Sequence, residues 1–229
     1  MYYDGVVFKP SLDELYHHGI LGQKWGKRNG PPYPLKQHSA SERIYKDASK
    51  RVTQITKDVT SAAKKAGSKM YGLENRLKTK ESKSRKIDKK SKEDNQSLSK
   101  SANDIKDAVR FTTISSEDSF VSSYEKFKSD LERKGYKETR CKNYWDLYKQ
   151  GKVKHKSVQS NFATKDGYEF EVQFHTEASQ DAKTKKIPIY EERRQVGISK
   201  SRAKELERQM TDLALKVPDP KDIYKIKSH

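Results

Sequence analysis

Polar side chains alternate with apolar ones in the segment YEFEVQFHT, residues 168–176. If this segment is a β-strand, Glu171, Gln173 and His175 share one face, because successive side chains point to opposite faces. Asp107 supplies a second carboxylate, in a strand predicted over residues 107–114. Two carboxylates on neighbouring strands are a common way to hold Mg²⁺ against substrate phosphates. The alternative is a sheet face that only meets water.

Basic side chains would have to bind any phosphate, because the sequence has neither GxxxxGK[ST] nor GxGxxG. Arginine and lysine can do this without a glycine loop. The chain has 229 residues with 50 Lys and Arg against 32 Asp and Glu, a net charge of +18. Such an excess favours a polyanionic partner, without distinguishing nucleic acid from nucleotide.

Several classes of protein are excluded by what the sequence lacks. The single Cys141 cannot form an internal disulfide, and no cysteine–histidine set has the spacing of a zinc site. No apolar run approaches the roughly 18 residues that cross a bilayer, and the N-terminus does not resemble a secretory signal. We therefore expect no membrane partner and a cytoplasmic location in a bacterial host.

The elements that must position these residues follow from periodicity. Apolar residues at helical spacing predict a helix from Ser39, capped by Ser41, to Gly67, and an amphipathic helix over 117–134 that ends at Gly135. Residues 70–100 predict a weakly apolar helix that runs into a mobile basic linker. Strands are expected over 107–114 and 136–144, followed by a hairpin that turns at Asp166-Gly167.

The C-terminal part of the chain predicts helices over 176–217, interrupted near Pro188 and Gly197, with Leu206, Met210 and Leu213 on the last one. Mixed strands and helices predict an α/β (α+β) domain, a mixed β-sheet flanked by helices. Hydrophobic residues make up 31% of the chain, below the usual ~45–50%, so the core must be concentrated in part of it.

A first set of motifs, Arg76-Leu77-Lys78, Glu81-Ser82 and Lys86-Ile87, resembles the synthetase domain of RelA/SpoT homologues, which transfer pyrophosphate from ATP. The resemblance covers roughly residues 70–195. A second element, Lys142-Asn143-Tyr144, is similar to the K-D-Y of the family's substrate loop, and Lys149 matches a lysine farther along. The third, FEVQFHT, is close to the family's V-E-[IV]-Q-[apolar]-R-T.

The resemblance implies a RelA/SpoT-like nucleotidyltransferase with ATP as the pyrophosphate donor and Mg²⁺ as the cofactor. Asp107 and Glu171 would hold the metal, and Glu171 would also act on the attacking hydroxyl. The residues implied at the ATP site are Arg76, Lys78, Ser82, Lys86 and Lys142. Those implied at the acceptor site are Tyr144, Lys149, His155, Ser157, Gln159, Gln173 and His175.

Three positions depart from the family's pattern. The family's metal-binding aspartate lies five residues before a strand arginine, whereas here Asp107 lies three residues and Asp104 six residues before Arg110. Strand alternation favours Asp107, because an odd offset keeps it on the face opposite Arg110. His155 replaces the family's stacking tyrosine, and Gln159 replaces its histidine. A protonated His155 would contact phosphate instead of stacking on guanine.

The domain organisation implied is a flexible arm over 1–38, an N-terminal helix over 39–69, the RelA/SpoT-like domain over 70–217 and a tail over 218–229. The segment HHGILGQKWGKR in the arm resembles a sequence near the start of many phage structural or capsid-associated proteins. We therefore expect the arm to serve delivery or attachment, with the protein carried in a phage particle. A phage particle or a neutralising antitoxin is a further expected partner.

Two acceptors stay open. A guanosine nucleotide, GDP or GTP, would make the protein an alarmone synthetase. A tRNA end, as in toxic members of the family, suits the charge of +18 and the altered His155 position, and is slightly favoured. The alternative outside enzymes is a non-catalytic phage particle protein that binds DNA through its basic surface.

Overall fold

The computed structural model describes residues 39–229 except 194 and 196. Its centre is a mixed five-stranded sheet in the order β1-β2-β5-β4-β3. The strands are β1 (Lys69–Tyr71), β2 (Arg110–Ile114), β3 (Lys137–Asn143), β4 (Val158–Ala163) and β5 (Glu169–His175). The pairing of β2 with β5 is parallel, and the other neighbours pair antiparallel. The predicted mixed α+β sheet is confirmed. The arm predicted over 1–38, with its phage-like segment, lies outside the described residues.

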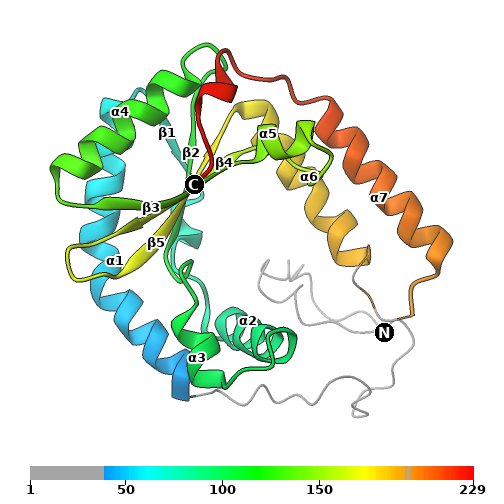
Figure 1. The fold of residues 1–229 in the computed structure, drawn as a ribbon, viewed down its shortest axis with the longest axis horizontal. Helices are drawn as coiled ribbons and strands as arrows, with labels where there is room; N and C mark the ends of the chain where they lie inside the picture. The colour runs from blue at the N-terminus through cyan, green and yellow to red at the C-terminus, as the bar shows by residue number, and fades with distance from the viewer. Residues whose placement is uncertain (1–38, 194, 196) are drawn as a thin grey trace, which may run out of the picture. The chain divides into compact units, whose positions relative to one another are not determined.

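Two long helices, α1 (Ser39–Lys65) and α4 (Phe120–Arg133), cover the apolar face of the sheet (Figure 1). Their predicted apolar stripes are confirmed, since the buried side chains include Val52, Ile55, Val59 and Ala62 of α1 and Phe120, Tyr124, Phe127 and Leu131 of α4. Phe127 packs edge-to-face on Phe174 of β5, with ring centroids 5.1 Å apart. Gly135 ends α4 with a φ of 89°, a conformation that favours glycine.

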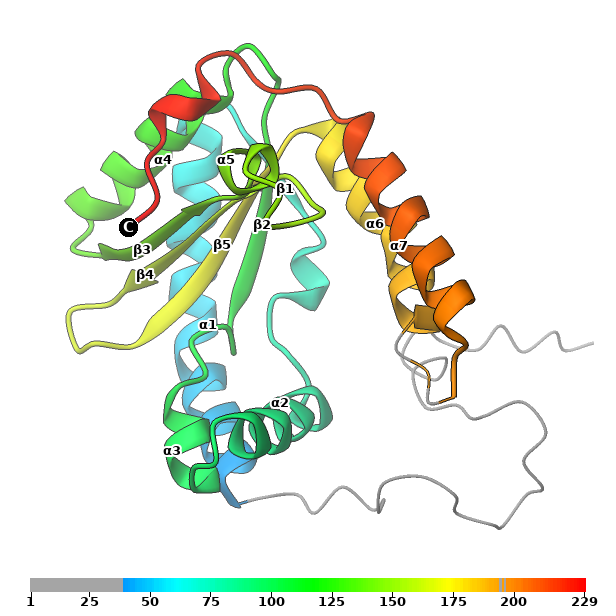
Figure 2. The same cartoon turned by 45° about the vertical axis from the view of Figure 1, so that its right-hand side comes forward.

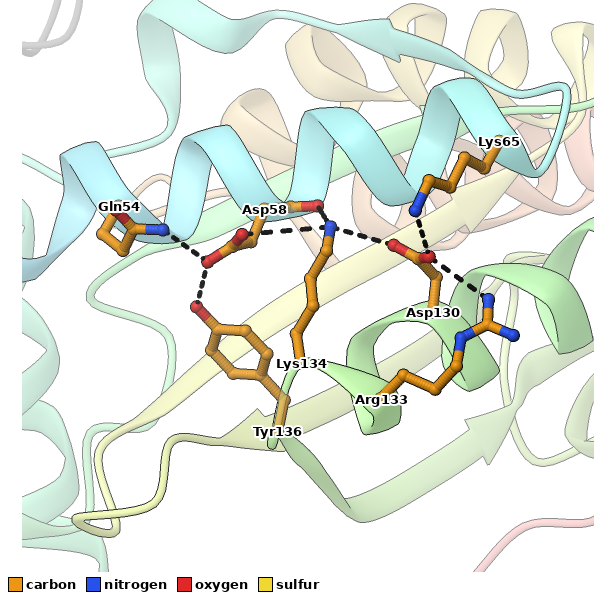
Figure 3. A network of polar contacts seen from close by, with 7 residues as sticks. All are labelled: Gln54, Asp58, Lys65, Asp130, Arg133, Lys134 and Tyr136. Atoms are coloured by element: carbon orange, nitrogen blue, oxygen red, sulfur yellow. Dashed lines mark hydrogen bonds and ion pairs between the residues drawn. The ribbon is translucent and has the colours of Figure 1, made fainter.

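A polar network fixes α4 against α1 (Figure 3). The side chain of Asp130 is only 3% exposed, and Lys65 Nζ and Lys134 Nζ lie 2.7 and 2.9 Å from its two oxygens. Lys134 Nζ also donates to the carbonyl oxygen of Asp58 at 3.0 Å. Burial alone would raise the pKa of Asp130, but hydrogen bonds from Lys65, Lys134 and Arg133 hold it well below its ordinary value. This side of the sheet is therefore closed by structural contacts.

Residues 70–100 depart from the predicted helix and mobile linker. They form β1, a short 3₁₀ turn (Leu73–Asn75), α2 (Lys80–Glu93) and the start of α3 (Leu98–Asn103), and α2 and α3 pack against α1 (Figure 2). Ile87 is fully buried, and Lys83 is only 1% exposed. Lys83 Nζ lies 4.5 Å from the ring centroid of Tyr45 in α1. The helix α2 therefore packs on α1 through a lysine stem and an aromatic ring, and not through the apolar stripe that a sequence pattern can detect.

Two elements begin or end at other residues than predicted. α1 begins at Ser39, so the predicted cap Ser41 lies inside the helix and is 1% exposed. The strand after Cys141 stops at Asn143, and Tyr144 begins a short helix, α5 (Tyr144–Lys149). The cause is the side chain of Asn143, whose oxygen accepts the backbone N–H groups of the first helical turn.

The predicted hairpin is confirmed as β4 and β5, and Gly167 in its turn has a φ of 82°. After β5 the chain forms a pair of helices, α6 (Glu177–Arg193) and α7 (Lys200–Leu215), which lie side by side (Figure 2). Pro188 does not interrupt α6 as predicted but lies inside the helix, although a proline there removes one backbone hydrogen bond. Like the other described helices, neither is long and apolar enough to cross a membrane.

The last helix follows its predicted pattern in part. Leu206 and Met210 are buried as predicted, but Leu213 is half-buried and Ala214 is buried in its place. Residues 218–229, expected as a tail, pack on the domain. The backbone of His229 exchanges two hydrogen bonds with Cys141, at 2.9 and 3.1 Å, so the C-terminus covers the edge strand β3.

Candidate functional site

Asp107 lies in a cluster of basic side chains just before β2. Lys86 Nζ is 2.6 Å from one carboxylate oxygen, and Lys78 Nζ contacts the other. Burial alone would raise the pKa of Asp107, but the charges of Lys78 and Lys86 lower it to about 2. Burial also lowers the pKa of Lys78, by more than the attraction of Asp107 raises it. The pair therefore joins a firmly charged carboxylate to an ammonium group that is poorly hydrated.

Two arginines lie next to this cluster along the backbone, and the charge of Arg110 acts on Lys78. Leu77 forms an isolated bridge with Val109, and the carbonyl oxygen of Arg76 accepts the N–H of Arg110 at 2.8 Å. The Arg76 guanidinium donates to the carbonyl oxygen of Leu73 at 2.7 Å. Its Nε is buried and has no partner within the described residues. A buried N–H without an acceptor is costly, and an anionic group beside it would satisfy it.

Glu171 lies at the level of this cluster in the sheet. It is the register partner of Arg110 in β2 and of Asn161 in β4. The side chain is half-buried, and its Oε1 accepts a hydrogen bond from Gln173 Nε2 at 2.7 Å. The sheet thus brings a second carboxylate to the strand next to the one that Asp107 precedes.

The two faces of β5 separate as predicted, with Phe170, Val172 and Phe174 in the apolar core. The polar face does not simply meet water. Gln173 and His175 are 5% and 3% exposed. Residues of α6 cover them, because Lys183 Nζ donates to Gln173 Oε1 at 2.6 Å and Ser179 Oγ lies 2.8 Å from His175 Nδ1.

The strand argument that separated Asp107 from Asp104 is wrong, because β2 begins at Arg110 and both carboxylates precede it. The tertiary structure separates them instead. Asp107 is in the cluster, whereas the Asp104 side chain is 43% exposed and 3.5 Å from Lys90. Of the other residues implied at the ATP site, Ser82 lies in the first turn of α2. Lys142 lies on β3, three strands from β2, so the structure does not bring it to the cluster.

A cavity of about 130 Å³ lies where the polar ends of β4 and β5 meet α6 and α7. It brings together four residues implied at the acceptor site, namely His155, Ser157, Gln159 and His175. Tyr144 adjoins them, because the centroid of its ring lies 4.3 Å from the centroid of the His155 ring. Lys149 does not join them, since its Nζ lies 4.7 Å from the ring centroid of Tyr224 in the C-terminal segment.

The surroundings of His155 disfavour the protonated form in which it was expected to contact phosphate. Burial, together with the charges of Lys186 and Lys183, lowers its pKa to about 4. The imidazole is therefore neutral near pH 7. Its ring instead forms an aromatic surface with Tyr144.

Lys183 and Lys186 of α6 were not among the residues that the sequence singled out, yet both line the cavity. Burial lowers the pKa of each to about 8. A spacing of three residues places them on one face of a helix. That spacing, directly after a strand with a polar face, is the sequence signal that points to them.

A Mg²⁺ ion held by Asp107 and Glu171 would have to share its coordination with a substrate. Within the described part of the chain, no three His, Cys, Asp or Glu side chains gather into a metal site. Mg²⁺ is usually bound by one or two carboxylates, with waters and substrate phosphates completing its coordination. Asp107 and Glu171 are of that kind, and the lysines on Asp107 would then turn to the phosphates.

No protein-family model and no curated protein matches the chain. Solved structures do resemble it. The Type VI effector Tas1, in the complex with its immunity protein, matches at 18% identity over 78% of this chain and 97% of that chain, with a TM-score of 0.49. Small alarmone synthetase 1 from Bacillus subtilis, bound to its product pppGpp, matches at 15% identity over 79% of this chain and 92% of that chain, with a TM-score of 0.49.

A GTP pyrophosphokinase family protein from Streptococcus pneumoniae matches at 14% identity over 77% of this chain and 96% of that chain, with a TM-score of 0.46. These solved structures include alarmone synthetases, the type of protein that the sequence motifs resemble. An activity for this chain has to be argued from its own residues.

Proposed function

We propose that this protein is a RelA/SpoT-like ATP-dependent pyrophosphotransferase that acts on a ribose hydroxyl. The observation that supports this most is the cationic cluster around Asp107, one strand away from Glu171. A triphosphate needs several positive charges and a nearby divalent cation, and this cluster offers the charges and the carboxylates together.

The donor ATP would lie at the cluster. Lys78 and Lys86 would leave Asp107 for the triphosphate, and the unpartnered Arg76 Nε would donate to a phosphate oxygen. Asp107 and Glu171 would hold Mg²⁺, which supplies further neutralisation of phosphate charge when bound. Such transfers depend on positioning and charge neutralisation more than on covalent catalysis by the protein.

The transfer itself needs one proton acceptor. The ribose oxygen of the acceptor forms a bond to the β-phosphorus of ATP, and the bond from that phosphorus to the α–β bridging oxygen breaks. AMP leaves with the electron pair, and Glu171 takes the hydroxyl proton. Gln173, which donates to Glu171 at 2.7 Å, orients the carboxylate.

The acceptor is either a guanosine nucleotide or the end of a tRNA. The neutral His155, whose ring lies tilted by 35° against that of Tyr144, provides an aromatic surface for a base in either case. The net charge of +18 supports the tRNA.

The test is incubation of the full chain and Mg²⁺ with ATP labelled at the β-phosphate and with GDP, GTP or total tRNA in parallel. We expect AMP release together with label in one acceptor, and neither with Glu171→Gln. Absence of transfer to all three acceptors, with salt-sensitive binding of duplex DNA, would instead support the non-catalytic DNA-binding alternative.

A further inference from the structure

The cavity beside β5 has an unusual balance of groups. Its walls include apolar side chains, Ala182 of α6, Ala214 of α7 and Val217 just after that helix. Among them lie the amines of Lys183 and Lys186. A water needs only about 10–15 Å³ of such space, so the roughly 130 Å³ here has room for a larger group. Apolar walls with a few convergent polar groups are typical of a ligand site.

The two lysines form no ion pair with an acidic side chain among the described residues, although the charge of Glu171 favours the charged form of Lys183. Lys183 Nζ donates to the neutral Gln173 at 2.6 Å, and Lys186 Nζ contacts the carbonyl oxygen of Lys154. Neither forms an ion pair among the described residues, whereas the next lysine on the same helix, Lys185, pairs with Asp181 at 2.6 Å. Half-buried ammonium groups without a counter-charge are costly. The lowered pKa of each agrees with this reading.

His175 provides an independent observation. It is 3% exposed and lines the cavity, and its Nε2 has no hydrogen-bond partner within the described residues. Its Nδ1 is engaged with Ser179 Oγ at 2.8 Å. Ser179 Oγ also lies 3.2 Å from the carbonyl oxygen of Thr176, which competes for the hydroxyl proton. A phosphate contact requires the tautomer in which the serine donates to Nδ1, so that Nε2 carries the proton and offers an N–H to the cavity. The lowered pKa of His175, caused first by burial, keeps the ring neutral.

We propose that this cavity binds a phosphate group of the acceptor, held by Lys183, Lys186 and His175 Nε2–H. A phosphate would supply the missing counter-charge to both amines and an acceptor for the imidazole N–H, which a neutral base cannot do. Other charged groups at the walls are already engaged, since Lys156 pairs with Asp219 at 2.8 Å. The assignment to the acceptor rests on the proposed function.

Placement favours the acceptor over the donor. The cavity lies at the end of β5, whereas the cluster around Asp107 precedes the start of the parallel strand β2. Gln173 joins the two regions, because it accepts from Lys183 and donates to Glu171. A phosphate on Lys183 would therefore set the distance between the acceptor and the carboxylate that takes its proton. Lys183 and Lys186 would be the residues that select a phosphorylated acceptor.

The test uses the full chain and inorganic phosphate, with no ATP and no acceptor. The protein is acetylated with limiting acetic anhydride near pH 8, and modification is quantified lysine by lysine by mass spectrometry. At a phosphate concentration of twice its Kd, mass action predicts about threefold slower acetylation of Lys183 and Lys186. Lys185, whose side chain is 60% exposed, should be unaffected.

Matched variants complete the design. In Lys183→Gln, the phosphate Kd measured from protection of Lys186 should rise about tenfold, because a charged hydrogen bond is lost. Lys183→Arg should retain phosphate binding, and Lys185→Gln should behave as the wild type. Each variant is first checked for an unchanged thermal midpoint, and the arginine variant keeps the test decisive if the glutamine variant does not fold.

Equal acetylation of both lysines with and without phosphate would overturn the site. The measurement is independent of catalysis, so the two proposals fail separately. Protection without any pyrophosphate transfer would leave a phosphate site and remove its assignment to the acceptor. Transfer without protection would leave the enzyme and remove this cavity from it.

Discussion

Replacing Asp107 with asparagine removes one charge and almost no volume, so it measures what the carboxylate does. Its side chain is 13% exposed and paired with Lys78 and Lys86. In the folded protein its pKa is about 2, against an ordinary value of 3.8. At 1.36 kcal/mol per pKa unit, that difference amounts to about 2 kcal/mol of folding free energy at neutral pH. Asp107→Asn also leaves the ammonium group of Lys78 buried without this carboxylate, so the loss should not be smaller than this value.

The pH dependence has a definite sign. The folded pKa lies below the unfolded one, so the stabilisation is complete above about pH 4 and is lost as the pH falls towards 2. At pH 3 about half of it should be left. A protonated Asp107 and an asparagine are both neutral, so the difference in stability between wild type and variant should fall to about half at pH 3 and vanish only below about pH 2.

The assay is urea unfolding of wild type and Asp107→Asn at pH 7 and pH 3, with the transition midpoint as readout. Asp104→Asn is the matched control. Its side chain is 43% exposed and 3.5 Å from Lys90, so we expect a smaller change in the midpoint than with Asp107→Asn. Transfer activity should be lost with Asp107→Asn alone. An unchanged midpoint at pH 7, a difference that does not narrow at pH 3, or a larger loss with Asp104→Asn would refute the reasoning.

Three further results are expected. Glu171→Gln should abolish transfer and change the unfolding free energy by less than about 1 kcal/mol, because the isostere keeps the volume; unchanged turnover would remove Glu171 from the site. If tRNA is the acceptor, its KM should rise by orders of magnitude between low and physiological salt, and rapid labelling of GDP or GTP with none in tRNA would contradict this. Gly135→Ala should destabilise the fold by about 1 kcal/mol or more in urea unfolding, because φ is 89° and the new Cβ would lie 2.4 Å from Lys165 Cε; stability equal to wild type would show that the turn relaxes freely.

The sequence by itself determined the elements with a strong local signal. The stripes of α1 and α4 repeat at helical spacing, and the hairpin of β4 and β5 carries Asp166-Gly167 at its turn, so each depends on neighbours in the chain. The alternation of Phe170 and Val172 with Glu171 likewise identified which face of β5 joins the core.

Only the tertiary structure decided where the other groups lie, because their environment is made by residues far away in the chain. Lys83 is buried against Tyr45 of α1, which turns a basic run into a packed helix. What distinguishes Asp107 from Asp104 is its contact with Lys78 and Lys86, not strand alternation. The neutrality of His155, and the cavity that Lys183 and Lys186 line, come from burial between β4, α6 and α7. Loss of hydration depends on what surrounds a group in space, so no spacing of residues in the sequence could have fixed it.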